Sequence, residues 1–207
     1  MKRRLTQRPL AHRSTGASRR EWFRFTGLSV FILLLWSGMP AHAYTDMLKH
    51  SYSLLDAVDA NDVDAVRQFM LRRTSPDRAD DAGRTPLSVA AGNGNVDIVK
   101  LLLDNGARPS LKDASAKTPL HLAAVNNQDL TAALLLDRGA VIDAQDSQGI
   151  TPLMLAAGKG NLEVIKVILA HHPDPGKHDF TGRTALDWAV QAKQTGAARL
   201  LRGPGAS

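Results

Sequence analysis

The chain has 207 residues, of which 43% are hydrophobic and 22% charged, a composition that predicts a folded domain and excludes collagen-like, largely disordered and multi-spanning membrane proteins. It contains no cysteine, which excludes disulfides, a thiolate nucleophile and cysteine-ligated metal or iron–sulfur sites. The formal net charge is +6, but residues 1–43 alone carry +7, from eight basic side chains and one acidic one. The remaining residues carry a net charge of −1, which gives no electrostatic reason to expect binding to nucleic acid.

The N-terminal segment, residues 1–43, has the three parts of a secretory signal peptide. A basic, polar stretch precedes the apolar run 28–36, Pro40 follows, and residues 41–43 form a small-x-small cleavage site. The apolar run is too short to span about 30 Å of hydrocarbon comfortably. We therefore expect cleavage before Tyr44, with an uncleaved and tilted N-terminal anchor as the alternative.

Residues 18–24 suggest the route of export. They read Ser-Arg-Arg-Glu-Trp-Phe-Arg and resemble the twin-arginine motif S-R-R-x-F-L-K in the type of six of its seven residues. The alternative is an ordinary Sec signal with a chance arginine pair, because Arg3 and Arg4 form another such pair. Either route predicts a periplasmic location, with secretion or N-terminal anchoring as alternatives.

Residues 47–207 contain a motif that recurs every 33 residues. Each copy begins with an aspartate, which is usually followed by a glycine three residues later. A Thr-Pro-Leu or Thr-Ala-Leu segment comes next, and an alanine stands three residues after the leucine. The repeated positions are Asp80, Asp113, Asp146 and Asp179; Gly83, Ala116, Gly149 and Gly182; and Thr85, Thr118, Thr151 and Thr184. The pattern resembles the ankyrin repeat, D-x-x-G-x-T-P-L-H-x-A followed by L-L-L-x-x-G-A. This resemblance implies an all-α fold, a solenoid of stacked helix-turn-helix units joined by hairpin-like turns.

The residues of one repeat predict the same structure on physical grounds. Gly83 suits the positive φ of a tight turn, and Thr85 can cap a helix whose first residue is proline. Val99 and Leu102 belong to an apolar stripe on a second helix, and Gly106 suits a left-handed C-cap. No unit can bury its apolar face alone, so the units must stack.

The pattern divides residues 47–207 into five repeats, of which the first and last are degenerate caps. The approximate repeats are 47–79, 80–112, 113–145, 146–178 and 179–207. In the last repeat Ala185 replaces proline, and we expect Trp188 at an inner apolar position.

The fourth repeat departs from the pattern over residues 171–179. His171 and His172 stand near the position of the expected Gly-Ala pair, and the nine residues hold three histidines and two aspartates. These side chains are candidate zinc or nickel ligands, so a metal-binding or enzymatic role at 171–179 is one alternative. No two of the histidines have the i, i+4 spacing of ligands on a helix, so we expect instead a loop that ends the helix with proline and glycine.

The sequence predicts no catalytic residue, no cofactor and no metal. Phosphate-binding-loop, zinc-protease and serine-nucleophile motifs are missing from the sequence. The repeated aspartates are expected to cap turns, and His121 is expected to bond neighbouring turn groups. We therefore expect a protein that is not an enzyme.

The ankyrin resemblance implies that a protein partner meets the concave face formed by the turns and the first helices. The residues predicted to contact it are Arg84, Lys117, Ile150, Lys159, Phe180 and Arg183. Ile150 and Phe180 are expected to form an exposed apolar pair on adjacent turn tips, because a tip has no core to bury them. The alternative for Phe180 is packing onto the loop at 171–178. The cations around this pair favour an acidic partner.

These expectations together describe a monomeric, non-catalytic, exported protein that binds another protein in the bacterial periplasm and stabilises or inhibits a co-exported protein. Neither nucleic acid nor, after leader cleavage, a membrane is an expected partner. The alternatives are a secreted effector that binds a host or competitor protein, a membrane-tethered scaffold, and the metal-binding or enzymatic role at 171–179.

Overall fold

The computed structural model describes residues 53–203, which lie within one compact unit and contain five pairs of short helices and no strand. The first helices of the pairs are α3 (Leu54–Asp59), α5 (Pro86–Asn93), α7 (Pro119–Val125), α9 (Pro152–Lys159) and α11 (Ala185–Gln191). The second helices are α4 (Val63–Leu71), α6 (Val96–Asp104), α8 (Asp129–Asp137), α10 (Leu162–Ala170) and α12 (Thr195–Arg202). The all-α fold predicted from the sequence is confirmed. None of these helices is long and apolar enough to cross a membrane.

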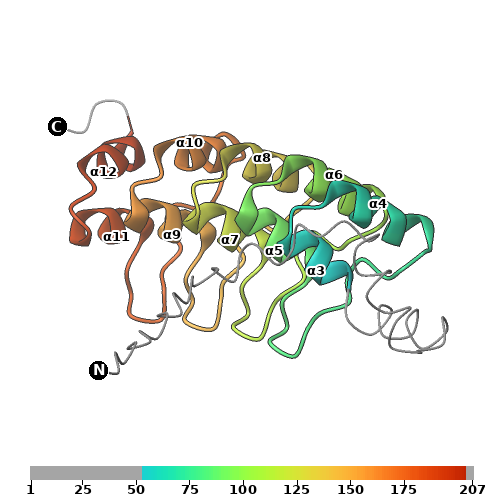
Figure 1. Cartoon of the computed structure of the whole chain (residues 1–207). Helices are drawn as coiled ribbons and strands as arrows, with labels where there is room; N and C mark the ends of the chain where they lie inside the picture. The colour runs from blue at the N-terminus through green and yellow to red at the C-terminus, as the bar shows by residue number, and fades with distance from the viewer. Residues whose placement is uncertain (1–52, 204–207) are drawn as a thin grey trace, which may run out of the picture. The chain divides into compact units, whose positions relative to one another are not determined.

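The helices form two layers, one of first helices and one of second helices, and the turns project from the layer of first helices (Figure 1). Each helix packs against its own partner and against the equivalent helices of adjacent repeats. The alanine at the same position of every repeat is completely buried in the first-helix layer, at Ala57, Ala90, Ala123, Ala156 and Ala189. Because a methyl group is all that stands at this position, neighbouring first helices approach closely.

The first turn of each first helix is fixed by its own side chains. Oγ1 of Thr85 accepts a hydrogen bond from the N–H of Ser88 at 3.1 Å, and Oγ of Ser88 accepts one from the N–H of Thr85 at 3.0 Å. Thr151 and Thr184 cap α9 and α11 with the same reciprocal geometry. These contacts satisfy N–H groups that have no partner within the helix, so the predicted caps at Thr85, Thr151 and Thr184 are confirmed. The hydroxyl of Thr118 instead lies 2.8 Å from Nδ1 of His121.

Four aspartates hold the turns between helix pairs. Oδ1 of Asp80 accepts from the N–H groups of Ala82 at 3.0 Å and Arg84 at 2.9 Å, and the backbone N–H of Asp80 donates to the carbonyl of Arg84 at 3.1 Å. The same three bonds recur at the other positions, Asp113, Asp146 and Asp179. The prediction that these carboxylates cap turns is confirmed.

His121 ties the third repeat to the fourth from a fully buried position. Its Nδ1 accepts from the N–H of Thr118 at 3.1 Å, so the neutral ring carries its proton on Nε2 and donates to the carbonyl of Ile150 at 3.0 Å. Burial lowers the pKa of His121 and favours this neutral form. The imidazole bonds turn groups on both sides, as the sequence predicts.

The segment at 171–178 keeps the geometry of the other repeats. α10 ends at Ala170, and His172 has a φ of 55°, at the position where Gly106 and Gly139 have φ values of 87° and 84°. The sequence predicts a loop that ends the helix with proline and glycine in place of a glycine cap; glycine is indeed missing from the cap position, but α10 ends before Pro173 and His172 takes the left-handed conformation. The position in the helix pair decides the backbone conformation, and histidine adopts it at a cost in strain that glycine would not incur.

A second left-handed position lies in each turn. Glycine occupies it at Gly83, Gly149 and Gly182, but Ala116 adopts a φ of 60° there. The left-handed conformation costs an L-residue about 1–2 kcal/mol because the Cβ atom crowds the backbone. The turn of the third repeat therefore stores strain that the other turns avoid.

Replacing this alanine gives a test of the turn geometry. Ala116→Gly should raise the free energy of unfolding by about 0.5–1 kcal/mol, because relief of strain exceeds the extra flexibility of glycine in the unfolded chain. Urea denaturation measures the difference. The matched control is Gly149→Ala, which should lower the stability, because the added Cβ would lie 2.9 Å from the backbone nitrogen of Phe180. A less stable Ala116→Gly variant would contradict this description of the turns.

Candidate functional site

The candidate site is the side of the first-helix layer that meets the projecting turns, which we call the turn–helix face (Figure 1). On its helices one row of apolar residues repeats every 33 positions, at Val89, Leu122, Leu155 and Trp188, and the last three of these side chains are only partly buried. At the base of the turns a second row repeats, at Arg84, Lys117, Ile150 and Arg183. All six residues predicted to contact a partner lie in the turns or at the end of a first helix.

Ile150 does not have the exposed position that the sequence analysis assigned to it. Its side chain is only 6% exposed and belongs to the core. Its carbonyl accepts from the N–H of Asp146 at 3.0 Å, which places Ile150 at the base of a five-residue turn and not at its tip. The same carbonyl receives the His121 bond, so this base packs against the preceding repeat. The expectation of an exposed Ile150–Phe180 pair is therefore wrong.

Phe180, in contrast, is at a true turn tip and is 75% exposed. Its N–H donates to the carbonyl of Gln148 in the preceding tip at 3.0 Å. The ring lies over Gly149, where a Cβ atom would come within 2.6 Å of Phe180 Cδ1. The ring thus rests on the backbone of the neighbouring turn, not on the loop at 171–178 as the alternative reading had it, and presents most of its surface to solvent.

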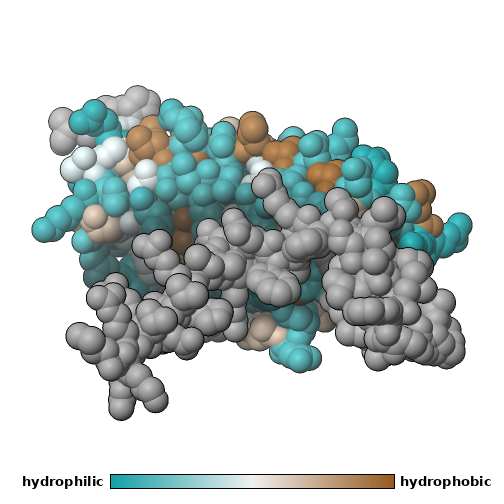
Figure 2. All heavy atoms as spheres, viewed as in Figure 1, coloured by the Kyte–Doolittle hydropathy of each residue, from teal (hydrophilic) through white to brown (hydrophobic). Residues whose placement is uncertain are grey.

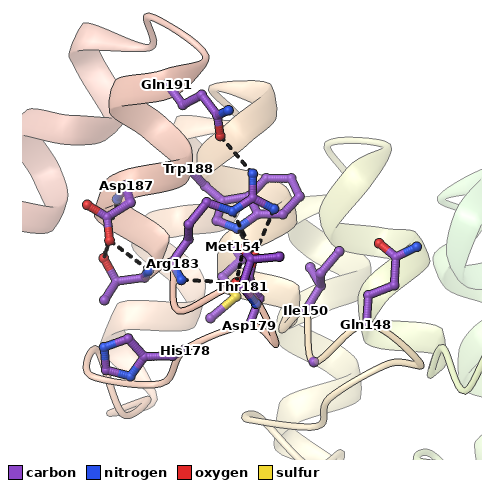
Figure 3. Close-up of polar contacts among 12 residues, drawn as sticks. Gln148, Ile150, Met154, His178, Asp179, Thr181, Arg183, Asp187, Trp188 and Gln191 are labelled. Carbon is purple, nitrogen blue, oxygen red and sulfur yellow. Dashed lines mark hydrogen bonds and ion pairs between the residues drawn. The ribbon is translucent and has the colours of Figure 1, made fainter.

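Arg183 and Trp188 are joined by a buried carboxylate (Figure 3). Asp179, 4% exposed, accepts from Nε and Nη2 of Arg183 at 2.9 Å each and from Nε1 of Trp188 at 2.9 Å. The guanidinium carbon of Arg183 lies 4.5 Å from the centroid of the Trp188 ring, and Nη1 donates to Gln191 at 2.9 Å. This network holds both side chains in one geometry.

The same network sets the charge of Asp179. Burial alone would raise the pKa of this carboxyl, but hydrogen bonds from Thr181, from the backbone and side chain of Arg183 and from Trp188 hold it well below its usual range. The carboxylate is ionised and fully engaged, so its charge is offset by Arg183 and does not face a partner.

A depression lies between α9 and α11 beside this network. It has a volume of about 280 Å³ and is lined by Leu155, Gly158, Lys159, Trp188, Gln191 and Ala192. Lys159 and Arg183, which the sequence analysis proposed as contacts, thus lie at or next to the same depression. Trp188 was expected at an inner position and is instead partly exposed on this face. The sequence feature that could have indicated this site is the tryptophan itself, which stands where other repeats have leucine or valine.

The other predicted contacts lie further along the same face. Arg84 is exposed and forms ion pairs with Asp80 at 2.8 Å and with Asp59 at 4.0 Å. Its charge is therefore offset by carboxylates of the first two repeats. Lys117 is partly buried at the base of the third repeat's turn. The structure therefore gathers Lys159, Phe180 and Arg183 in the last two repeats, and leaves Arg84 in a distant one.

The loop at 171–179 does not gather its polar side chains. His171 bonds the carbonyl of Val167 at 2.9 Å and approaches Asp137 of α8 at 3.3 Å, contacts that raise the pKa of this histidine. Within residues 53–203 no three histidine, aspartate or glutamate side chains converge as metal ligands would. The imidazole of His171 connects two second helices.

The comparison with protein families agrees with this architecture. A family model described as "Ankyrin repeats (3 copies)" matches residues 54–146 and 131–207. The chain belongs to the ankyrin repeat family. A search of curated proteins finds no match. Ankyrin repeats indicate a protein–protein interaction module. On the turn–helix face described above, the exposed groups include the Phe180 ring and the side chain of Lys159.

The distinction between Ile150 and Phe180 can be measured. Ile150→Ala should lower the free energy of unfolding by about 2–4 kcal/mol, because it leaves a cavity beside His121 in a close-packed core. Phe180→Ala should change it by no more than about 0.5 kcal/mol, because most of the ring is exposed in the folded state. Denaturant unfolding of the two variants measures both effects. Equal destabilisation would contradict the assignment of Ile150 to the core and of Phe180 to the exposed turn tip.

Proposed function

We propose that this ankyrin protein is exported to the bacterial periplasm, is not an enzyme, and binds another protein through its turn–helix face, either stabilising or inhibiting a co-exported protein. The observation that carries the proposal is Phe180, an aromatic ring 75% exposed at the tip of the turn that also holds Arg183 of the fixed Arg183–Trp188 pair. Exposed aromatic and arginine side chains on a rigid scaffold are the groups that dominate protein–protein binding energies.

A binding role fits the polar groups of this face better than catalysis does. Oδ1 of each turn aspartate accepts two backbone N–H bonds, and His121 is buried with both ring nitrogens bonded. A general acid or base must reach a substrate proton, which these engaged groups do not do. We therefore propose a monomeric binding module without cofactor or metal.

The proposal of export depends on residues 1–43, which lie outside the described residues. Their basic segment, apolar run and cleavage site support a cleaved signal peptide, and residues 18–24 support the twin-arginine route. The rival hypotheses are retention of the leader as a membrane anchor and secretion of an effector that binds a host or competitor protein.

The export route can be tested by changing the arginine pair. Replacement of both Arg19 and Arg20 by lysine should leave uncleaved precursor in the cytoplasm, because a receptor, not hydrophobicity alone, reads a twin-arginine signal. Cell fractionation and N-terminal sequencing measure the outcome, and the exported wild-type product should begin at Tyr44. The matched control, Arg3 and Arg4 changed to lysine, should be exported normally. Normal export of both double variants would favour the Sec route.

Binding through the turn–helix face can be tested by capture of proteins from a periplasmic extract. Phe180→Ala should weaken capture of a partner roughly thirtyfold, the effect of losing about 2 kcal/mol from a central aromatic contact. Leu130→Ala is the matched control, because Leu130 is a 68% exposed apolar residue on α8 in the layer of second helices. Figure 2 shows that apolar side chains also reach the surface along this layer. Loss of capture in the Leu130 variant alone would contradict the proposed face.

A further inference from the structure

The depression between α9 and α11 has one wall, the ring of Trp188, that is held in place by neighbouring groups. Trp188 Nε1 is bonded to Asp179 at 2.9 Å, and the guanidinium group of Arg183 covers one side of the indole ring. Gly158 approaches the ring so closely that a Cβ atom there would lie 3.0 Å from Trp188 Cε3. A ligand that enters therefore meets an aromatic wall that has already lost its rotamer freedom, which lowers the entropic cost of binding.

The size of the depression limits what it can hold. Its volume of about 280 Å³ lies just below the range of roughly 300–1,000 Å³ that is typical of sites for small molecules and cofactors. Leu155, Trp188 and Ala192 supply apolar surface, while Lys159 and Gln191 supply the polar part of the lining. One aromatic side chain fits this combination, because it can pack in offset or edge-to-face contact with the indole.

The one charged residue in the lining of the depression, Lys159, favours an anionic neighbour for that side chain. Lys159 is exposed, and no ion pair is formed by it with any residue between 53 and 203. Two carboxylates of the same repeat as Trp188 are engaged by other groups: Asp179 is buried under Arg183, and Asp187 accepts from the N–H and hydroxyl of Thr184 at 2.8 and 2.7 Å. Figure 3 shows Asp187 turned away from the Trp188 ring. The depression has no acidic residue in its lining.

We propose that the depression between α9 and α11 binds one aromatic side chain of an acidic segment in a protein partner, and that Lys159 pairs with a carboxylate next to that aromatic residue. This inference rests on the proposed function, because it assumes that a protein partner binds the turn–helix face. It goes further by naming the chemistry of the partner: an aromatic residue flanked by aspartate or glutamate.

Trp188 itself reports on the proposed site. The chain has three tryptophans, and Trp22 and Trp36 both lie in the leader, so a full-length chain with Trp22→Phe and Trp36→Phe retains one indole, in the wall of the depression. The probe is a synthetic nonapeptide with blocked ends, a central phenylalanine, and aspartate and glutamate on both sides. Its titration should produce a saturable change in Trp188 emission that weakens as salt is raised, because the charge pair is exposed.

Two altered peptides separate the parts of the proposal. Replacement of the central phenylalanine by alanine should weaken binding by about tenfold or more, because the aromatic contact is lost. Replacement of the acidic residues by lysine should abolish the emission change. Equal binding of the alanine peptide would overturn the aromatic assignment, and equal binding of the lysine peptide would overturn the acidic one.

Matched variants of the protein test the role of Lys159. Lys159→Glu should weaken binding of the acidic peptide by about fivefold or more, the effect of turning an attractive exposed pair into a repulsive one. Lys100→Glu, an exposed lysine on α6 in the other layer, should leave it unchanged. Equal losses in both variants would show attraction to the net charge only and would overturn the site. Thermal melting of both variants confirms that the fold is intact.

The outcomes distinguish this inference from the proposed function. If Phe180-dependent capture of a periplasmic protein succeeds while no peptide alters Trp188 emission, the assigned occupant is wrong and the binding function stands. If the acidic aromatic peptide binds with the predicted dependence on Lys159 but capture fails, the inference about the depression stands and the periplasmic function is wrong.

Discussion

No helix pair of this protein can bury its apolar face without a neighbour, and the rest of the structure follows from that constraint. The completely buried alanines, such as Ala90 and Ala123, exist because adjacent first helices must lie in close contact. Polar side chains reinforce the same interfaces: His121 reaches the carbonyl of Ile150, and Asn161 donates to the carbonyl of Ala124 at 2.8 Å. Stability therefore arises between repeats as much as within them, and loss of one interface weakens its neighbours.

Because the contacts that stabilise the fold lie between repeats, the exposed side chains of the turn–helix face are free to contact a partner. Backbone groups of the turns are satisfied by the repeated aspartates, and consecutive tips are joined by backbone bonds such as that from Phe180 to Gln148. The side chains at the tips and on the outer surface of the first helices have no structural role in common. They differ between repeats for that reason, and in the last two repeats they include Phe180 at a turn tip and Trp188 and Lys159 at the depression between α9 and α11.

The 33-residue period predicts the structural features that all repeats share, but it does not predict the positions of side chains that are particular to one repeat. The threonine caps, the aspartate-held turns and the bonds of His121 could all be predicted, because each depends on residues within one or two adjacent units. Ile150 was misplaced because its equivalents are Arg84, Lys117 and Arg183, polar residues typical of a surface. Only the fold shows that this position lies at the base of the turn, where an apolar side chain joins the core.

The site also depends on contacts that the period does not reveal. Trp188 is held in its position by Asp179, nine residues earlier, and lies against Gly158 of the preceding repeat, and neither relation follows from sequence spacing. Similarly, His172 has the left-handed conformation that glycine has at the equivalent positions 106 and 139. The position within the repeat determines the backbone conformation of this segment, and the residue type changes only the strain energy of that conformation.

The central claim is that the face of the last two repeats formed by turns and first helices contacts the partner, and site-specific photo-crosslinking in living cells tests it most directly. A photoreactive phenylalanine analogue placed at Phe180 should give a covalent adduct with one periplasmic protein under illumination. The same analogue placed at Leu130, equally exposed on the layer of second helices, should give none. An adduct from position 130 without one from position 180 would contradict the account and assign recognition to the second helices.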